Sequence, residues 1–200
     1  MKLIVITGET FFKGEAEIVC RLFEAGLERL HVRKPHTSEN RLHAFLSELP
    51  EEVCRNVVLH DHFSLCQNFK VGGFHLNRRQ SHAVTTREQS LSKSCHSIDE
   101  LIEISNYQYV FISPVFDSIS KNGYQTPFSR EDWGYARERG LIQEKVYALG
   151  GITPSRLSKV ANFGFAGAVV LGWLWGEKPE KQVGDILSRF HLLQEKMSFL

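Results

Sequence analysis

Three side chains of basic character stand where an early apolar run ends, in His31-Val32-Arg33-Lys34. Side chains alternate along an extended chain, so His31 and Arg33 point to the same side. A basic pair at the end of a strand suits a phosphate or diphosphate group. The alternative is that Arg33 and Lys34 only form ion pairs on the surface. We expect Arg33 to contact an anionic substrate.

The next apolar run ends in His60-Asp61-His62. A carboxylate at a strand end is a typical ligand of Mg²⁺, which it holds against substrate phosphates, so Asp61 is the candidate metal ligand. Flanking histidines also suggest a zinc or iron site, but alternation places His60 and His62 on the face opposite Asp61. We interpret His75, in the following run, as a hydrogen-bonded core histidine.

A later run ends with Ser94 and His96, which share one face and are both candidates for substrate contact. His96 is suited to proton transfer, because an imidazole titrates near neutral pH. No acid and nucleophile accompany it in the arrangement of a hydrolase triad.

The segment 117–128 is polar and long for a loop that follows a strand. Two hydroxyls and a cation within it, Ser118, Ser120 and Lys121, form a candidate anion clamp. Long loops at the carboxyl ends of strands are often functional lids, although a solvated loop is the alternative.

Glycines follow the last two apolar runs, at Gly150-Gly151 and at Gly172. Glycines at a strand-to-helix turn let backbone N–H groups approach a phosphate at a helix N-terminus. Each could equally form a tight turn, but two such sites in neighbouring loops favour phosphate binding. The chain has no G-x-G-x-x-G or P-loop motif, which argues against a dinucleotide fold.

These residues follow eight short runs rich in β-forming residues, which alternate with helix-like segments. The alternation predicts an α/β protein, either a closed (β/α)₈ barrel or an open doubly wound sheet. Residues 97–102 and 153–154 carry helix-start signals, and an apolar stripe indicates a last helix. No linker divides residues 1–200, so we expect one domain. The predicted runs are Lys2–Thr7, Arg29–Arg33, Asn56–His60, Gly73–Leu76, Leu91–His96, Tyr109–Ile112, Val146–Leu149 and Ala168–Leu171.

Composition excludes several classes of protein. With 24 Lys+Arg against 23 Asp+Glu, the net charge is +1, which argues against a nucleic-acid partner. The 4 cysteines form no C-x-x-C pair and fit reduced, mostly buried thiols. Apolar stretches are too short for a signal peptide or a membrane span, so we expect a cytoplasmic protein. A homo-oligomer is compatible with the sequence. At 200 residues, any barrel must have short helices.

The ordered motifs resemble the thiamine phosphate synthase family, which includes the related thiazole tautomerase TenI. The resemblance covers nearly the whole chain. It implies a (β/α)₈ barrel that joins hydroxymethylpyrimidine diphosphate to a thiazole phosphate with Mg²⁺. The matching pieces are His31-Val32-Arg33-Lys34, Leu59-His60-Asp61, Gly73-Phe74-His75-Leu76, Ser94-Cys95-His96-Ser97, Ser113-Pro114-Val115-Phe116 with Ser118 and Lys121, and Ala148-Leu149-Gly150-Gly151-Ile152-Thr153.

The resemblance also implies roles for residues of this chain. Arg33 and Lys121 would hold the diphosphate, and Asp61 would be a Mg²⁺ ligand. Ser94 would contact the reacting pyrimidine. The thiazole phosphate pocket would be formed by a further set of residues: Ser118, Ser120, Gly151 and the backbone at Gly172.

The sequence departs from the family pattern at metal and substrate positions. His31 and His60 stand where synthases usually carry glutamine and asparagine, and we expect them to bind substrate. The second Mg²⁺ carboxylate, expected near Gln80, is missing from Asn77-Arg78-Arg79-Gln80. This loss weakens Mg²⁺ binding, while Arg78 or Arg79 would partly replace the charge of the metal.

These losses weaken the synthase hypothesis and make a tautomerase the alternative. His96 matches the histidine of the TenI Ser-x-His-Ser motif. Ser113-Pro114-Val115-Phe116 and the retained Asp61 favour the synthase. A third hypothesis, from another class, is a catalytically silent binder of thiazole or thiamine phosphates. All three predict small phosphorylated heterocycles as ligands.

Overall fold

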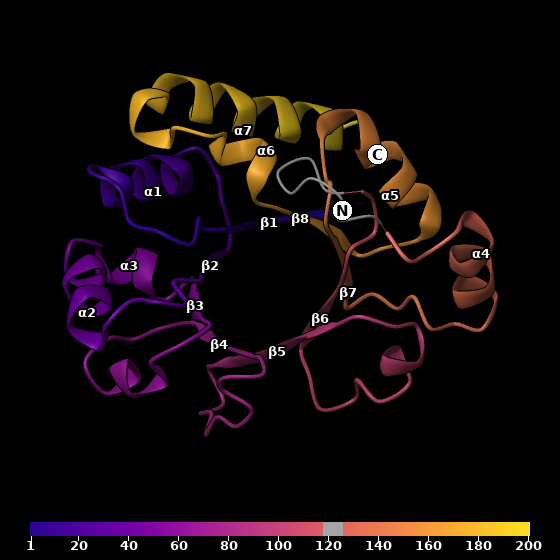
Figure 1. Cartoon of the computed structure of the whole chain (residues 1–200), viewed down its shortest axis with the longest axis horizontal. Coiled ribbons are helices and arrows are strands. Elements are labelled where there is room, and N and C mark those ends of the chain that lie inside the picture. The colour runs from indigo at the N-terminus through magenta and orange to yellow at the C-terminus, as the bar shows by residue number, and fades with distance from the viewer. Residues whose placement is uncertain (118–125) are drawn as a thin grey trace.

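Eight parallel strands close into a barrel in chain order, and β1 pairs with β8 to complete it. This computed structural model describes residues 1–117 and 126–200. The strands form the ring at the centre of Figure 1. They are β1 (Lys2–Ile6), β2 (Leu30–Val32), β3 (Val57–Leu59), β4 (Gly73–Leu76), β5 (Ser90–Cys95), β6 (Tyr109–Ile112), β7 (Val146–Leu149) and β8 (Gly167–Val170). The prediction of eight strands is confirmed, and the closed form of the sheet is the correct one.

The apolar strand sequences are explained by burial on both faces. One cluster of side chains fills the interior of the barrel, including Ile4, Phe111 and Val169. Neighbouring strand residues such as Val5 and Val110 instead belong to a larger cluster shared with the helices. The barrel is therefore a packed core, and ligands must bind at one of its ends.

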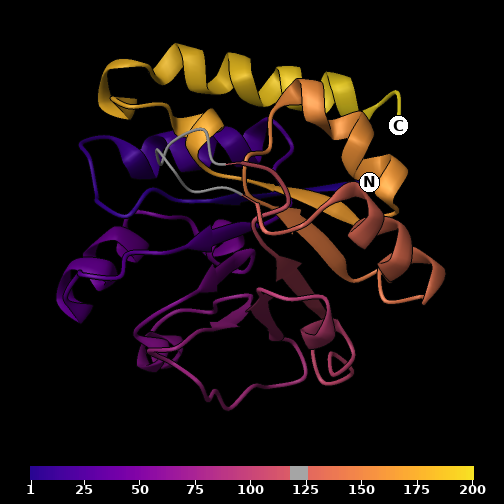
Figure 2. The ribbon, with the colours of Figure 1, turned by 45° about the vertical axis from the view of Figure 1, so that its right-hand side comes forward.

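Helices cover the outside of the barrel unevenly (Figure 1). They are α1 (Glu15–Glu24), α2 (Glu39–Ser47), α3 (Glu51–Cys54), α4 (Arg130–Glu138), α5 (Leu157–Phe163), α6 (Gly172–Trp175) and α7 (Val183–Met197). Single 3₁₀ turns make up the rest: η1 (Phe63–Gln67), η2 (Asp99–Leu101), η3 (Pro154–Arg156) and η4 (Pro179–Lys181). The long helix α7 lies along one side, and the two chain ends lie near each other (Figure 2).

The connections around β3 to β6 are shorter than an ordinary barrel repeat. The helix after β3 was expected to be short, and η1 confirms this. A helix starting near Ser97 was expected after β5, but only η2 forms. The reason is length, because residues 96–108 must hold both loops as well as the turn. The Ser97 hydroxyl still accepts the Glu100 N–H at 3.4 Å, so the predicted cap is present without its helix.

The last helix completes the outer layer of the barrel. Ile186, Phe190 and Leu193 on α7 are buried, as their spacing predicts. The indole N–H of Trp175 donates to the Ile6 carbonyl at 2.7 Å and ties α6 to β1.

All 4 cysteines are free, two of them buried. Within the described residues, no helix is long and apolar enough to cross a membrane.

Candidate functional site

The carboxyl end of β2 presents Arg33 at one mouth of the barrel. Its backbone N–H donates to the buried Thr7 hydroxyl at 3.0 Å, which fixes the chain beside the end of β1. Its guanidinium donates to the Glu9 carboxylate at 2.7 Å, and the side chain is 30% exposed. Arg33 is therefore anchored at its backbone and free to face an anion with its remaining donors.

Asp61, directly after β3, is held by Arg79 in a two-point ion pair. Arg79 Nε lies 2.8 Å from Oδ1, and Nη2 lies 3.1 Å from Oδ2. The carboxylate side chain is only 10% exposed, whereas that of Arg79 is 43% exposed. The hydrogen bond to Asp61 raises the pKa of Arg79 above its usual value. The pair is neutral as a whole, and it holds the Arg79 guanidinium in a fixed position at the mouth.

Asn77 explains why Arg79 reaches Asp61. Its side-chain oxygen accepts the backbone N–H of Arg79 at 2.8 Å and that of Gln80 at 3.2 Å, which closes a tight turn after β4. Its amide nitrogen donates to the His60 carbonyl and ties this turn to β3. The local sequence Asn77-Arg78-Arg79-Gln80 thus folds back toward the neighbouring strand.

Lys34 does not add charge to the mouth, and its ion pair is buried rather than on the surface. Its ammonium lies 2.7 Å from a Glu15 carboxylate oxygen, and both side chains are 1% exposed. Desolvation raises the pKa of Glu15 and lowers that of Lys34. Alternation turns Lys34 away from Arg33 and into the layer between β2 and α1.

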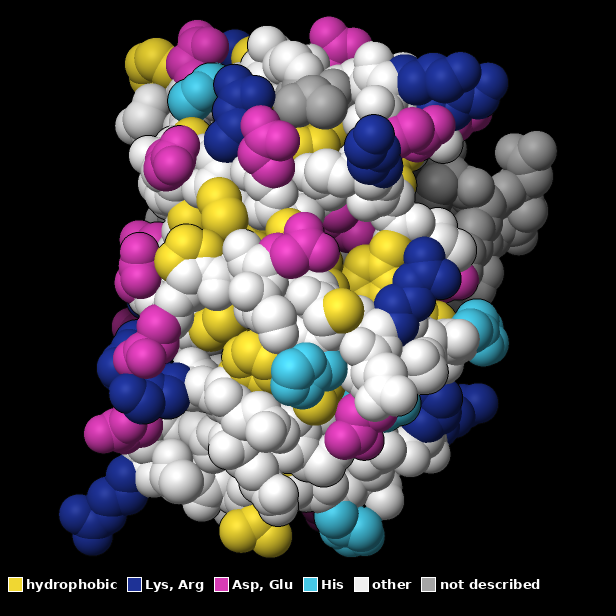
Figure 3. All heavy atoms as spheres, turned by 90° about the vertical axis from the view of Figure 1, so that its left-hand side faces the viewer, with side chains coloured by type: hydrophobic (Ala, Val, Ile, Leu, Met, Phe, Trp, Pro, Cys, Tyr) yellow, Lys and Arg dark blue, Asp and Glu magenta, His cyan; other side chains and the backbone are white. Residues whose placement is uncertain are grey.

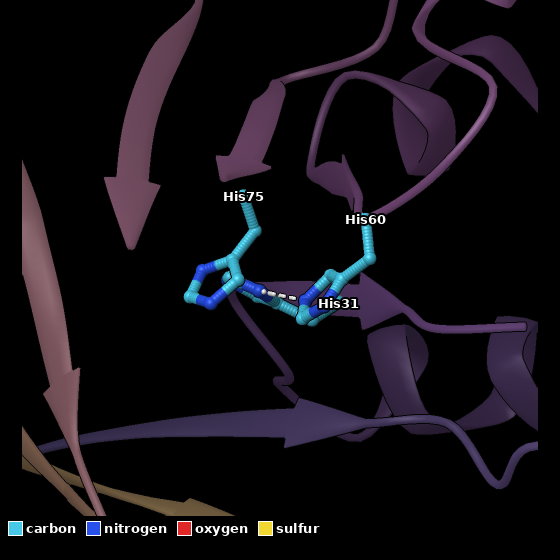
Figure 4. Close-up of side chains that lie close together, drawn as sticks. All are labelled: His31, His60 and His75. Carbon is cyan, nitrogen blue, oxygen red and sulfur yellow. Dashed lines mark hydrogen bonds between the residues drawn. The ribbon is translucent and has the colours of Figure 1, made fainter. Parts of the chain in front are cut away.

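Three histidines from adjacent strands meet inside the barrel (Figure 4). His31, His60 and His75 belong to β2, the end of β3, and β4, and are 0%, 4% and 1% exposed. His31 Nδ1 lies 2.9 Å from His60 Nε2, and His31 Nε2 lies 2.7 Å from the Tyr109 hydroxyl. The rings of His60 and His75 are stacked, with centroids 4.2 Å apart. Substrate contact by the buried His31 and His60 stays a prediction.

His75 is a satisfied core histidine, as predicted. Its Nδ1 lies 2.9 Å from the Ser92 hydroxyl and its Nε2 2.9 Å from that of Ser94. Burial, followed by the nearby charge of Arg33, lowers the pKa of His75 to about 3. Burial likewise lowers the pKa of His31 and of His60 well below the usual value. All three imidazoles are therefore neutral at physiological pH.

His96 lies beyond the end of β5 and is exposed. Its Nδ1 is 3.2 Å from the Ser113 carbonyl oxygen, so Nδ1 carries the hydrogen. That bond leaves the Nε2 lone pair as the proton acceptor. Ser94, although predicted to share a face with His96, turns inward to His75.

The Gly150-Gly151 turn follows β7, with φ values of 99° and 63° that only glycine adopts easily. A Cβ at Gly150 would come within 2.7 Å of Pro114 Cα, and one at Gly151 would collide with the Asp117 carbonyl. Both glycines are thus needed for packing, and their role in phosphate binding stays a prediction.

Gly172 begins the short helix α6. The predicted clamp residues lie outside the described residues: Ser118, Ser120 and Lys121.

Two features of this mouth escaped sequence reasoning. Arg156 donates to the Gly151 carbonyl at 2.6 Å and places a further cation beside the glycine turn. The histidine cluster with Tyr109 was also missed. Its signal was present, because His31 on β2 and His75 on β4 sit at interior positions of strands that both flank β3, but only the register of the barrel shows that the two rings touch.

A closed barrel of parallel strands, with charged and proton-accepting groups at the carboxyl ends of the strands, defines the class of (β/α)₈-barrel enzymes. Within that class, the family model described as thiamine monophosphate synthase matches residues 3–173. The chain belongs to this family, whose members act in thiamine biosynthesis.

Known relatives extend over most of the chain. It is 30% identical over 175 residues to a thiamine-phosphate synthase of Bordetella pertussis, with 78% of each chain covered. A thiamine-phosphate synthase of Chlamydia abortus is 24% identical over 186 residues, covering 86% of this chain and 85% of that one.

Solved structures agree with this assignment. The crystal structure of a thiamine phosphate pyrophosphorylase from Bacteroides thetaiotaomicron is 36% identical, with a TM-score of 0.88 over 99% of this chain and 98% of that one. A thiamine phosphate pyrophosphorylase from Pyrococcus furiosus is 18% identical with a TM-score of 0.75, covering 98% of this chain and 95% of that one. At that identity, the second likeness shows the fold alone.

The family generally depends on Mg²⁺, so the fit of this mouth to Mg²⁺ can be tested. Mg²⁺ sites use one or two carboxylates together with substrate phosphates. Here both oxygens of Asp61 are occupied by Arg79, and the expected second carboxylate near Gln80 is absent. The residues present therefore do not fit the usual two-carboxylate site, and a guanidinium stands where the cation would bind.

Proposed function

We propose that this protein catalyses the thiamine-phosphate synthase reaction, which couples hydroxymethylpyrimidine diphosphate to a thiazole phosphate and releases diphosphate. The observation that carries the proposal is the pairing of Asp61 with Arg79 beside Arg33, at the mouth of a barrel of this family. Two guanidinium groups at one mouth, each paired with one carboxylate, keep further N–H donors whose geometry suits a leaving diphosphate.

In this reaction, the bond between the pyrimidine methylene carbon and the diphosphate oxygen breaks, and the electron pair leaves with diphosphate. The resulting pyrimidine-methyl cation is captured by the thiazole nitrogen, which forms the new C–N bond. The main task of the protein is to bind and neutralise a departing anion. Arg33, Arg79 and the predicted Lys121 perform it, and Asp61 orients Arg79.

Mg²⁺ on Asp61 stays a prediction, because such a metal would first have to displace Arg79. We assign the neutralising charge to Arg79 instead. The pyrimidine is placed near Ser94, and the thiazole phosphate near Gly151 and Gly172, where Arg156 adds a positive charge.

The partners we propose are these small phosphorylated heterocycles, without nucleic acid or membrane. The free cysteines fit a cytoplasmic protein, and a homo-oligomer is compatible with the proposal. Acidic and basic side chains are interspersed on the face shown in Figure 3.

The test is an assay of diphosphate release by the purified protein. Both substrates are supplied together, each is then omitted, and the set is repeated with Mg²⁺ and with EDTA. We expect release that requires both substrates and survives EDTA. Release only with Mg²⁺ would refute the role given to Arg79, and no release under any condition would refute the synthase.

A tautomerase remains the second candidate because of one observation. His96 is exposed at the end of β5, with its Nδ1 hydrogen directed to Ser113, and within residues 1–117 and 126–200 its Nε2 has no hydrogen-bond partner and can accept a proton. Such a group could shuttle a proton between two thiazole carboxylate phosphate tautomers without a metal. Loss of isomerisation in His96→Ala supports this role, and unchanged isomerisation excludes it. Saturable binding without either turnover would indicate a silent binder.

A further inference from the structure

The histidine cluster inside the barrel is built from three neighbouring strands, and one ring nitrogen of each histidine lies within 4.8 Å of the others. We propose that His31, His60 and His75 bind a divalent transition metal of the Zn²⁺ or Co²⁺ type beneath the mouth. This site is separate from the Asp61–Arg79 pair and does not depend on the proposed synthase activity.

The donor set selects the metal. Imidazole nitrogen suits zinc, cobalt, nickel and copper, whereas Mg²⁺ prefers oxygen ligands. Histidine binds metal through a neutral ring, and burial in an apolar interior keeps these three rings neutral. At neutral pH, no imidazolium therefore has to lose a proton before the metal binds.

The spacing of the rings is close to that of a three-histidine metal site. With Zn–N bonds of about 2.0–2.1 Å in a tetrahedral arrangement, ligating nitrogens lie roughly 3.3 Å apart and ring centroids about 5 Å apart. The His31 centroid is 5.1 Å from that of His60 and 5.3 Å from that of His75. His31 Nδ1 and His60 Nε2 already face each other at 2.9 Å.

The outer nitrogens of two rings have the partners that metal-binding histidines require. A ligating histidine almost always donates its other N–H to an oxygen, which fixes the ring and its tautomer. His31 Nε2 faces the Tyr109 hydroxyl at 2.7 Å, and His75 Nδ1 faces the Ser92 hydroxyl at 2.9 Å. These partners leave His31 Nδ1, His60 Nε2 and His75 Nε2 as the ligand atoms.

Binding changes three contacts of the metal-free protein, two hydrogen bonds and one ring stack. The hydrogen shared between His31 and His60 gives way to the metal, and the His31 tautomer shifts so that Nε2 donates to Tyr109. His75 exchanges its bond to Ser94 for the metal and turns from its stacked position on His60, where the ring planes are 18° apart. The released Ser94 hydroxyl or a water can complete four coordination from the mouth side, as in catalytic zinc sites.

The test uses protein without a histidine tag, stripped of metal by a chelator and then dialysed. Zn²⁺ is titrated by calorimetry, and Co²⁺ by visible absorption. We expect one metal per chain and the strong visible bands of four-coordinate Co²⁺. His31→Gln and His60→Asn, which place amides at these positions, should abolish the bands. Tyr109→Phe should weaken binding by about 10–100-fold through loss of the outer partner.

Two matched controls locate the metal. Asp61→Asn removes the mouth carboxylate, and His43→Ala removes an exposed histidine on α2; both should keep the Co²⁺ bands. Circular dichroism of each metal-free variant shows whether it is folded. No binding to the folded protein, or bands retained in both folded His31→Gln and His60→Asn, would overturn the proposal. The readout of this test is metal binding. Its outcome therefore does not depend on whether the synthase assay detects diphosphate release.

Discussion

At the scale of single residues, the mouth is organised by one ion pair. Asp61 was predicted to hold a metal, yet it holds Arg79, and Asn77 sets the turn that makes this possible. A guanidinium carries one positive charge and several directed N–H donors, so it can bind a diphosphate directly. Under the proposed function, Arg79 would supply the positive charge that a metal ion otherwise provides.

Arg79→Gln should lower kcat/KM for diphosphate release by about 10–100-fold, because a hydrogen bond to a charged group is worth about 1.5–3 kcal/mol. Steady-state assays of diphosphate release measure the effect. Arg78→Gln, one position away on the exposed turn, is the matched control and should remain close to wild type. Equal activity of both variants would show that Arg79 takes no part.

At the scale of elements, a buried ion pair joins the end of β2 to the first helix. Lys34 also lies over the Phe11 ring, with the ammonium 4.4 Å from the centroid, and donates to the Thr10 carbonyl at 2.9 Å. Glu15 stands in the first turn of α1, where a negative charge is favourable. The pair therefore fixes where α1 starts, and with it the loop that carries Glu9 beside Arg33.

Lys34→Met should destabilise the protein by about 3–5 kcal/mol, because it leaves the Glu15 carboxylate buried without a partner. Urea unfolding measures the loss. The double variant Lys34→Met with Glu15→Leu should recover most of it, since no buried charge remains.

Lys70→Met provides the control, because Lys70 pairs with Glu51 on the surface, where the side chains are 65% and 56% exposed. It should leave the urea midpoint close to that of the wild type, because solvent screens an exposed ion pair. A similar small loss for Lys34→Met would contradict the structural role of the buried pair.

At the scale of the whole molecule, closure of the barrel creates the polar core. Tyr109, Ser92 and the three histidines come from β2 to β6, and none of their contacts exists until those strands are aligned. Phe111 packs against His31 and His75 with centroids 4.7 Å and 4.8 Å apart, so the cluster is enclosed by apolar surface. Folding therefore buries three neutral imidazoles together.

This burial predicts how stability depends on pH. The folded pKa of each cluster histidine lies below the unfolded value, so the unfolded chain binds more protons as pH falls below about 6.5. Stability should be complete above that pH and decline on acidification toward pH 3, by up to roughly 1.4 kcal/mol per pH unit for each histidine. Urea unfolding in EDTA at pH 7, 6 and 5 measures the slope.

His31→Gln should reduce that slope by up to one histidine's contribution. His43→Gln, which changes an exposed histidine, should leave the slope unchanged. Identical slopes for wild type and His31→Gln would rule out the buried cluster as the cause.

Much of the fold followed from the sequence alone, because eight short runs rich in β-forming residues alternate with helix-like segments, and several of these runs are continuously apolar, as strands buried on both faces require. Alternation also located Arg33 and Asp61 at the ends of strands. These are local properties, which depend on the order of neighbouring residues.

The tertiary structure alone decided which side chains meet. Barrel closure and strand register brought His31 against His60 and His75, the Asn77 turn carried Arg79 to Asp61, and packing of α1 buried Lys34. Contacts of this kind join residues far apart in the chain, and the periodicity of the sequence does not predict them. The sequence thus predicted the strands that carry the chemistry of this protein. Closure of the barrel and the register of its strands determined the charged site and the imidazole site, because side-chain interactions act over only a few ångströms.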